Sequence, residues 1–189
     1  MSNKERTFLV SDTHFGHKNI CVFTDSVTGK KLRPWDDVEM MNEDMIVMWN
    51  QTVNPEDKVY HLGDAVMNRK WLPIFHRLNG RKILIKGNHD IAPALDLLEY
   101  FDDIRACHIM NNCILTHIPI HPSQFYRFGV NIHGHLHNDR ILDKFGKIDP
   151  RYYNVCVEHT NFKPILIEDV FARIREQGGD IDMKRQGNR

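Results

Sequence analysis

The sequence predicts an α/β fold, a sandwich of two sheets with helices outside them in αββα layers. Early in the chain, apolar β-branched runs alternate with helical spacing, whereas the later runs follow one another with little helix between them. Residue types that bind metals also come directly after several of the predicted strands. We therefore expect a second, more antiparallel sheet, and a polar site at the C-terminal ends of the strands.

Short runs rich in β-branched and apolar residues define the expected strands. They lie at 7–11, 58–62, 82–85, 113–116, 130–133, 152–157 and 165–167. Between the first two, the segment 36–50 spaces Met41, Met45 and Trp49 as an amphipathic helix requires. Further helices are expected at 69–78, 92–100 and 168–177.

The length of 189 residues is that of a single domain, which we expect to span 1–177. Beyond Gly178-Gly179 the chain is polar, so 178–189 is expected to form a flexible C-terminal tail. The start of the chain carries no signal-peptide core, and no apolar stretch has membrane length. We expect a cytoplasmic protein without a membrane partner.

Charge and cysteine usage exclude some classes of function. Lys+Arg 25 balance Asp+Glu 25, which disfavours a protein that grips long nucleic acid through its phosphates but permits a small anionic substrate. The four cysteines are scattered and form no Cys-x-x-Cys pair, so a disulfide framework or a thiolate zinc site is not expected. The twelve histidines are the unusual count, and their positions matter.

Five predicted strands each run into a short block of metal-ligand residue types. The blocks are Asp12-Thr13-His14, Gly63-Asp64, Gly87-Asn88-His89-Asp90, His117 and Gly134-His135-Leu136-His137. Taken singly, most of these blocks are typical of tight turns or of a buried histidine. The pair His135 and His137 is more informative, because alternate residues on extended backbone point to the same side.

In this order, the five blocks resemble the motifs of the calcineurin-like metallophosphoesterases, and the opening 11–17 resembles a compact branch of bacteria and phages. The resemblance implies a dinuclear metal site, with Asp64 bridging the two ions. It assigns Asp12, His14 and His137 to one metal, and Asn88, His117 and His135 to the other. It also implies that His89 is the catalytic proton donor and that Asp90 orients it.

The ligands are nitrogens and oxygens, so two divalent ions fit, with Mn²⁺ favoured and Fe, Zn, Ni or Co acceptable. The implied reaction is hydrolysis of a small phosphate ester by a hydroxide shared between the metals. A phosphodiester, such as a nucleotide or cyclic nucleotide, is slightly preferred to a monoester. His17 shares a loop with two ligands and is a candidate substrate contact. Basic residues that flank the blocks are Arg69, Lys86, Arg127 and Arg140.

Two alternatives stay open at this point. A nuclease acting on nucleic acid ends is disfavoured by the neutral charge balance, although a local basic patch would revive it. A catalytically silent metal-binding scaffold should lack ligands or the proton donor, whereas here every one of those positions is filled. The natural substrate, the metal, the oligomeric state and the role of 138–189 do not follow from the sequence.

Overall fold

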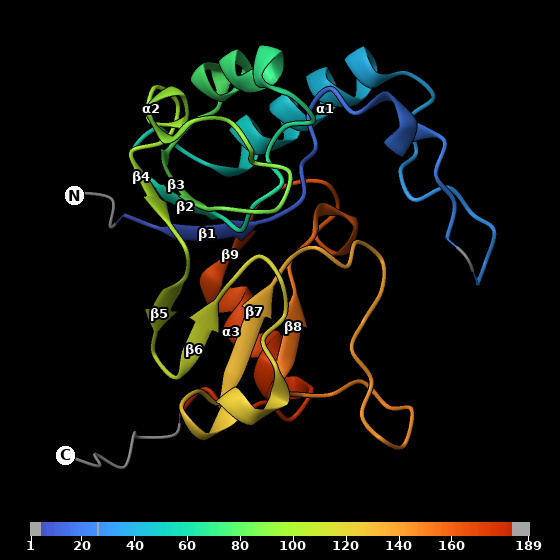
Figure 1. Cartoon of the computed structure of the whole chain (residues 1–189), viewed down its shortest axis with the longest axis vertical. Helices are drawn as coiled ribbons and strands as arrows, with labels where there is room; N and C mark the ends of the chain where they lie inside the picture. Colours follow the sequence, from blue (N-terminus) through green and yellow to red (C-terminus); the bar gives the residue numbers. More distant parts are fainter. Residues whose placement is uncertain (1–4, 26, 183–189) are drawn as a thin grey trace.

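A computed structural model describes residues 5–25 and 27–182, and it consists of two sheets with their helices (Figure 1). The first sheet has the strand order β4-β3-β2-β1-β9, in which β1 to β4 run parallel and β9 is antiparallel to β1. Its strands are β1 (Thr7–Val10), β2 (Lys58–His61), β3 (Arg81–Ile85), β4 (Asp103–Arg105) and β9 (Ile165–Leu166). The predicted two-sheet α/β class is confirmed.

The helices that follow β1, β2 and β3 cover one face of this sheet (Figure 1). They are α1 (Val38–Thr52), the 3₁₀ helix η2 (Arg69–Arg77) and α2 (Ala94–Leu97). The side chain of Asp37 caps α1 by accepting from the Met40 N–H, and Met41, Met45 and Trp49 bury the face that the spacing predicted. A short 3₁₀ helix, η1 (Lys18–Cys21), precedes them.

Two helix predictions need correction. The segment predicted at 69–78 is a 3₁₀ helix rather than an α-helix, and it contains Pro73, which lacks the N–H that an α-helical ladder needs. The helix predicted at 92–100 is one turn long and has Pro93 as its N-cap.

The second sheet has the order β5-β6-β7-β8, and only β5 pairs antiparallel. Its strands are β5 (His108–Met110), β6 (Cys113–Leu115), β7 (Val130–His133) and β8 (Tyr152–Asn154). The expectation of a more antiparallel sheet is therefore wrong. A parallel crossover needs length rather than a helix, and the segments 116–129 and 134–151 return the chain largely as loops.

One hydrophobic core joins the two sheets. Leu115 and Ile132 from the second sheet share a cluster with Leu9 and Ile83 from the first, and Val170 of α3 (Ile167–Glu176) belongs to it. The other face of the second sheet lies against the loop that contains η3 (Pro122–Tyr126). There Phe125 meets Tyr152 edge-on, with ring centroids 4.9 Å apart, and Tyr152 Oη donates to Ile120 O.

The packed chain extends past the predicted domain end at 177. Ile181 is buried in the inter-sheet core, and Asn112 Nδ2 donates to Asp180 O at 3.0 Å. The tail prediction is thus corrected for 178–182, and its remainder, 183–189, lies outside the described residues. Within the described part of the chain, no helix is long and apolar enough to cross a membrane.

Candidate metal centre

The blocks after β1, β2, β3, β6 and β7 come together at the C-terminal ends of these strands, where side chains from both sheets meet. Two groups of three side chains each offer ligand atoms that lie within 4.8 Å of one another. The first group is Asp12, His14 and His137, and the second is Asp64, His117 and His135. Each group combines side chains from both sheets, so neither sheet alone could form the centre.

Asp64 lies between the two groups. Its Oδ2 is 3.4 Å from His117 Nε2 and 3.6 Å from His14 Nε2, so one carboxylate reaches a ring in each group. Asn88 joins the second group, because its Oδ1 lies 2.9 Å from His117 Nε2. The structure therefore brings together all seven residues that the resemblance named as ligands.

The donor atoms fit divalent cations. Asp12 Oδ1 and both ring nitrogens of His14 are buried and have no hydrogen-bond partner among the residues that the structure describes. Buried polar atoms are nearly always paired, because an unpaired one costs about 1–3 kcal/mol. Burial by itself raises the pKa of Asp12, yet the neighbouring His14 and His117 hold that pKa well below its usual value. The first group is thus an anionic cage with open lone pairs, as a metal requires.

The ligand loops have unusual backbone conformations. Five ligating residues adopt a left-handed φ: Asp12 (57°), His14 (48°), Asp64 (55°), His135 (70°) and His137 (47°). Left-handed φ is uncommon outside glycine, although Asp, Asn and His tolerate it best, and it collects at functional sites. At two glycines of the blocks, the backbone lies too close to other atoms to carry a side chain. A Cβ on Gly134 would collide with Ser11 Oγ, and one on Gly87 with Asp64 Oδ1.

Side chains hold the first group. Asp12 Oδ2 accepts from Ser11 Oγ at 2.5 Å, from the His135 N–H at 2.8 Å and from Cys156 Sγ at 3.1 Å. Two buried residues far apart in sequence, Arg33 and Glu158, also contact this group. Sequence reasoning missed all four of these supporting residues: Ser11, Arg33, Cys156 and Glu158.

Backbone groups hold the second group. Asp90 accepts from the N–H groups of Asp64 at 2.8 Å, Ala65 at 2.9 Å and Gly87 at 2.8 Å, tying the loop after β2 to the loop after β3. Burial raises the pKa of Asp90, and the backbone donors oppose that rise. His117 Nδ1 donates to Leu62 O at 2.8 Å, which leaves Nε2 free to bind a metal.

The prediction that Asp90 orients His89 is corrected by these bonds. Both Asp90 oxygens are occupied by backbone donors, and its carboxylate makes no hydrogen bond to the His89 ring within the described residues. His89 is instead placed by its own backbone, whose N–H donates to Asp64 Oδ1 at 2.8 Å. Its exposed ring lies 5.5 Å from that of His14, at the mouth of the centre.

His17 lies beside the first group in a fixed orientation. Its Nδ1 accepts from the Ile20 N–H at 3.0 Å, so the ring proton lies on Nε2. Burial lowers the pKa of His17, which favours this neutral form, and its ring centroid is 5.6 Å from that of His14. His17 therefore presents an N–H donor next to the ligands.

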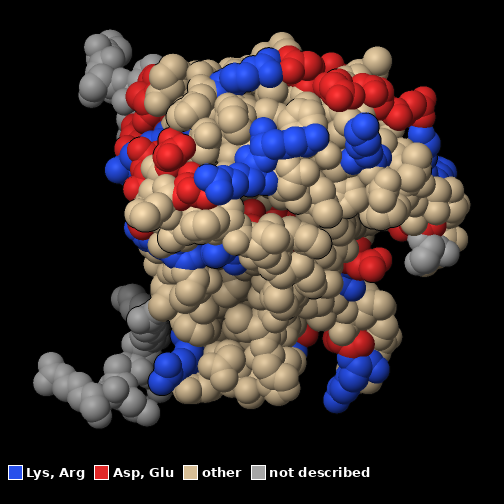
Figure 2. All heavy atoms as spheres, turned by 45° about the horizontal axis from the view of Figure 1, so that its top comes forward, with Lys and Arg blue, Asp and Glu red and all other residues tan. Residues whose placement is uncertain are grey.

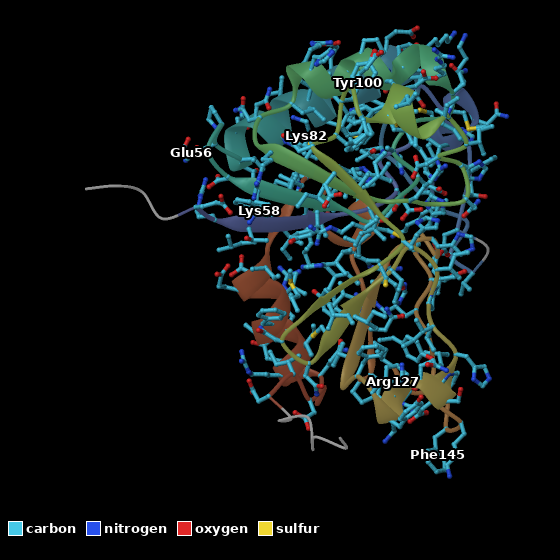
Figure 3. The ribbon with its side chains drawn as sticks, turned by 60° about the vertical axis from the view of Figure 1, so that its left-hand side comes forward. Glu56, Lys58, Lys82, Tyr100, Arg127 and Phe145 are labelled. Atoms are coloured by element: carbon cyan, nitrogen blue, oxygen red, sulfur yellow. The ribbon has the colours of Figure 1, made fainter. Side chains whose placement is uncertain are left out.

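Other polar residues near the blocks do not belong to the two ligand groups. His61 is fully buried against Thr13 Oγ1, and burial lowers its pKa to about 3; burial likewise lowers that of His133 to about 4. Arg69 pairs with Asp96 at 3.0 Å. Figure 3 places Arg127 at the far end of the second sheet, before β7 begins.

No protein-family model matches the chain. A structure of an archaeal phosphodiesterase is 19% identical with a TM-score of 0.43, over 79% of this chain and 82% of that one. The crystal structure of the Aquifex aeolicus protein AQ665, of unknown function, is 28% identical with a TM-score of 0.67, over 90% of this chain and 100% of that one. The Methanocaldococcus jannaschii protein MJ1445, itself described as uncharacterized, is 33% identical over 180 residues, or 92% of this chain and 93% of that protein. The chain therefore belongs to the same family as MJ1445.

Proposed function

We propose that the protein is a metal-dependent phosphoesterase that hydrolyses a small phosphate ester, with a phosphodiester preferred to a monoester. The observation that supports this is the pair of ligand groups joined by Asp64, whose Oδ2 reaches His117 and His14 at 3.4 and 3.6 Å. The resemblance of the five blocks to calcineurin-like metallophosphoesterases supports the same reaction.

We assign six of the ligands to one ion each and Asp64 to both ions. Asp12, His14 and His137 hold one ion, and Asp64 is shared. The other ion is held by Asn88, His117 and His135. Two divalent cations, with Mn²⁺ preferred, would supply an activated water at neutral pH and neutralise charge that builds on the phosphoryl oxygens.

The remaining residues position the ester and move protons. The exposed His89 ring at the mouth gives a proton to the departing oxygen, and its backbone bond to Asp64 Oδ1 fixes it relative to the ligands. The His17 Nε2–H donates to a phosphoryl oxygen. Because an alkoxide is a poor leaving group, a proton donor at this point assists hydrolysis of alkyl phosphate esters.

Positive and negative charges are mixed on the helix-covered face, which therefore gives no support to the binding of long nucleic acid there (Figure 2). On the helix-covered face, Figure 2 shows Lys and Arg side chains with Asp and Glu side chains beside them. Lys58 and Lys82, labelled in Figure 3, lie at the ends of β2 and β3 opposite to the ligand blocks. Binding to long nucleic acid would need a basic stripe leading to the centre.

The test is hydrolysis of bis-p-nitrophenyl phosphate and p-nitrophenyl phosphate by metal-stripped protein, with Mn²⁺, Ni²⁺, Zn²⁺ or no ion returned. We expect metal-dependent release from both compounds, faster from the diester. Release that is faster from the monoester would overturn the diester preference. No release from either compound with any ion, despite stoichiometric metal binding, would favour the silent scaffold instead.

A further inference from the structure

We propose that Arg33 and Glu158 form a buried clamp that assembles the first ligand group, by orienting His137 and by holding the loop of Asp12. The inference rests on the metal centre of the proposed function, and it does not depend on which ester is hydrolysed. It concerns positioning residues, since neither side chain belongs to the two ligand groups.

Glu158 selects the ring state of His137. Its Oε1 lies 3.2 Å from His137 Nδ1, so the carboxylate accepts a hydrogen bond from the Nδ1–H. In the neutral ring, a histidine whose Nδ1–H is held in this way has its lone pair on Nε2, where it can face a metal. Glu158 lies in the 3₁₀ helix η4 (Val157–His159), directly beyond the strand end of β8, so its backbone is fixed by the second sheet.

Arg33 joins Glu158 to the loop after β1. Its Nε and one terminal nitrogen each lie 2.9 Å from Glu158 Oε1. Two of the remaining guanidinium donors reach backbone carbonyls, that of Asp12 at 2.6 Å and that of Thr13 at 2.8 Å, and the third faces Met41 Sδ at 3.6 Å. The planar fork of arginine can make these bonds together, whereas lysine could not.

The carbonyls that Arg33 holds belong to a strained loop. Asp12 and His14 have left-handed φ values of 57° and 48°, and the two bonded carbonyls lie between them. The clamp thus fixes the backbone from which two ligands project, while Glu158 fixes the third ligand. One contiguous chain of bonds reaches every member of the first group.

Burial shows that this pair is not a surface ion pair. The side chains of Arg33 and Glu158 are 0% and 2% exposed. A buried pair gains little stability over apolar residues of the same size, because both charges must be desolvated. Its contacts with the Asp12 carbonyl and with His137 agree with a role in placing ligands.

A matched control exists at the other end of the first sheet. Asp57 is also buried and accepts from Arg6 Nε at 3.1 Å and from a second Arg6 nitrogen at 2.5 Å. Its partners lie at the start of β1 and β2, opposite to the ligand blocks. Replacing Asp57 therefore breaks an arginine pair with a buried carboxylate, in which the Arg6 side chain is 42% exposed, without touching the centre.

The experiment titrates metal-stripped protein with Mn²⁺ and counts free ion by electron paramagnetic resonance. In wild type we expect two bound ions. In Glu158→Leu we expect one ion with unchanged affinity and one weakened by about 10–100-fold, the usual effect of losing an outer-shell partner. Glu158→Gln keeps an acceptor oxygen and should recover part of that loss. Asp57→Leu should lower the unfolding temperature and leave both affinities unchanged.

A second readout needs no metal. In ¹⁵N-histidine spectra of stripped protein at pH 8.5, His137 should show its proton on Nδ1 in wild type and a mixture of both ring forms in Glu158→Leu. Wild-type affinities in Glu158→Leu, or an equal loss at one site in Asp57→Leu, would overturn the clamp. Failure of wild type to bind Mn²⁺, Ni²⁺ or Zn²⁺ would defeat the proposed function instead, and the spectra would still test the clamp.

Discussion

The two halves of the metal centre are supported in different ways. The first group is held by charged and polar side chains from distant parts of the chain, above all Arg33 and Glu158. The second is held by backbone groups, through the three N–H donors to Asp90 and the bond from His117 to Leu62 O. The difference teaches that the first half depends on particular side chains, whereas the second follows from the parallel strands that supply its loops.

The largest effect should come from the residue that belongs to both halves. Asp64→Asn removes the charge that His14 and His117 share at 3.6 and 3.4 Å. We expect turnover to fall by about 10³-fold, as when a central electrostatic group is lost. The affinity for both ions should fall by more than the roughly 10–100-fold that losing an outer-shell partner costs. Titration with Mn²⁺ and rates on the diester measure this, and a loss confined to one ion would contradict the shared role.

The next effect separates chemistry from metal binding. His89→Ala should lower turnover by about 10²–10⁴-fold, since one proton-transfer group is removed, while two ions stay bound. The matched control is His76→Ala, which removes another exposed histidine, one that contacts Tyr100 on the helix-covered side. Full activity in His89→Ala would show that another group protonates the leaving oxygen.

A third substitution tests the backbone-held half. Asp90→Asn replaces one carboxylate oxygen by an N–H₂ group, which faces donors and leaves at least one buried N–H unpaired. We expect a loss of about 1–3 kcal/mol in unfolding free energy, measured by urea denaturation of stripped protein. The affinity of the second ligand group for its ion should fall, and that of the first group should not. Equal weakening of both ions would erase the distinction between the halves.

The ligands could be predicted from the sequence, whereas the residues that support them could not. All seven ligands follow strands and lie in short blocks, so pattern and resemblance located them. Arg33 lies in a loop with no motif, and 125 positions separate it from Glu158, so only the folded chain pairs them. The role expected for Asp90 failed because sequence adjacency to His89 does not determine where a carboxylate points.

The sequence likewise predicted some elements of the fold and missed others. Short runs rich in apolar and β-branched residues located β1, β2, β3 and β7, and α1 lay within two residues of its predicted start. The strands β4 and β5 were missed, because each is three residues long and half-exposed and so has no apolar run. The direction of the second sheet was mistaken because loops, rather than helices, make its parallel crossovers.

Acid should affect the supports of both halves. His61, at the end of β2, and His133, at the end of β7, have folded-state pKa values of about 3 and about 4, below the ordinary 6.5. Between those values and 6.5 the unfolded chain binds more protons, so stability falls as pH drops below 6.5 and is unaffected by these groups above it. Each histidine should contribute about 1.4 kcal/mol per pH unit. Urea unfolding at pH 7 and 5.5 measures the slope, and His61→Gln should reduce it by one proton; an unchanged slope would mean that His61 titrates normally.

The smallest effect concerns the substrate contact. His17→Asn keeps an oxygen that can accept from the Ile20 N–H but removes the Nε2–H donor. Loss of one hydrogen bond to a charged oxygen should lower kcat/KM about tenfold. His17→Gln places an amide N–H near the lost donor and should restore part of the rate. Equal rates in wild type and His17→Asn would remove His17 from the substrate site.

The left-handed ligands connect the centre to the stability of the fold. Each of the five such residues holds a conformation that costs about 1–2 kcal/mol and that glycine adopts freely. Together they amount to several kcal/mol, a large share of a typical domain's stability. Glycine at any one of these positions would relieve that cost but would remove a side chain from one of the two groups. The geometry of the centre is therefore held against the conformational preference of its own backbone.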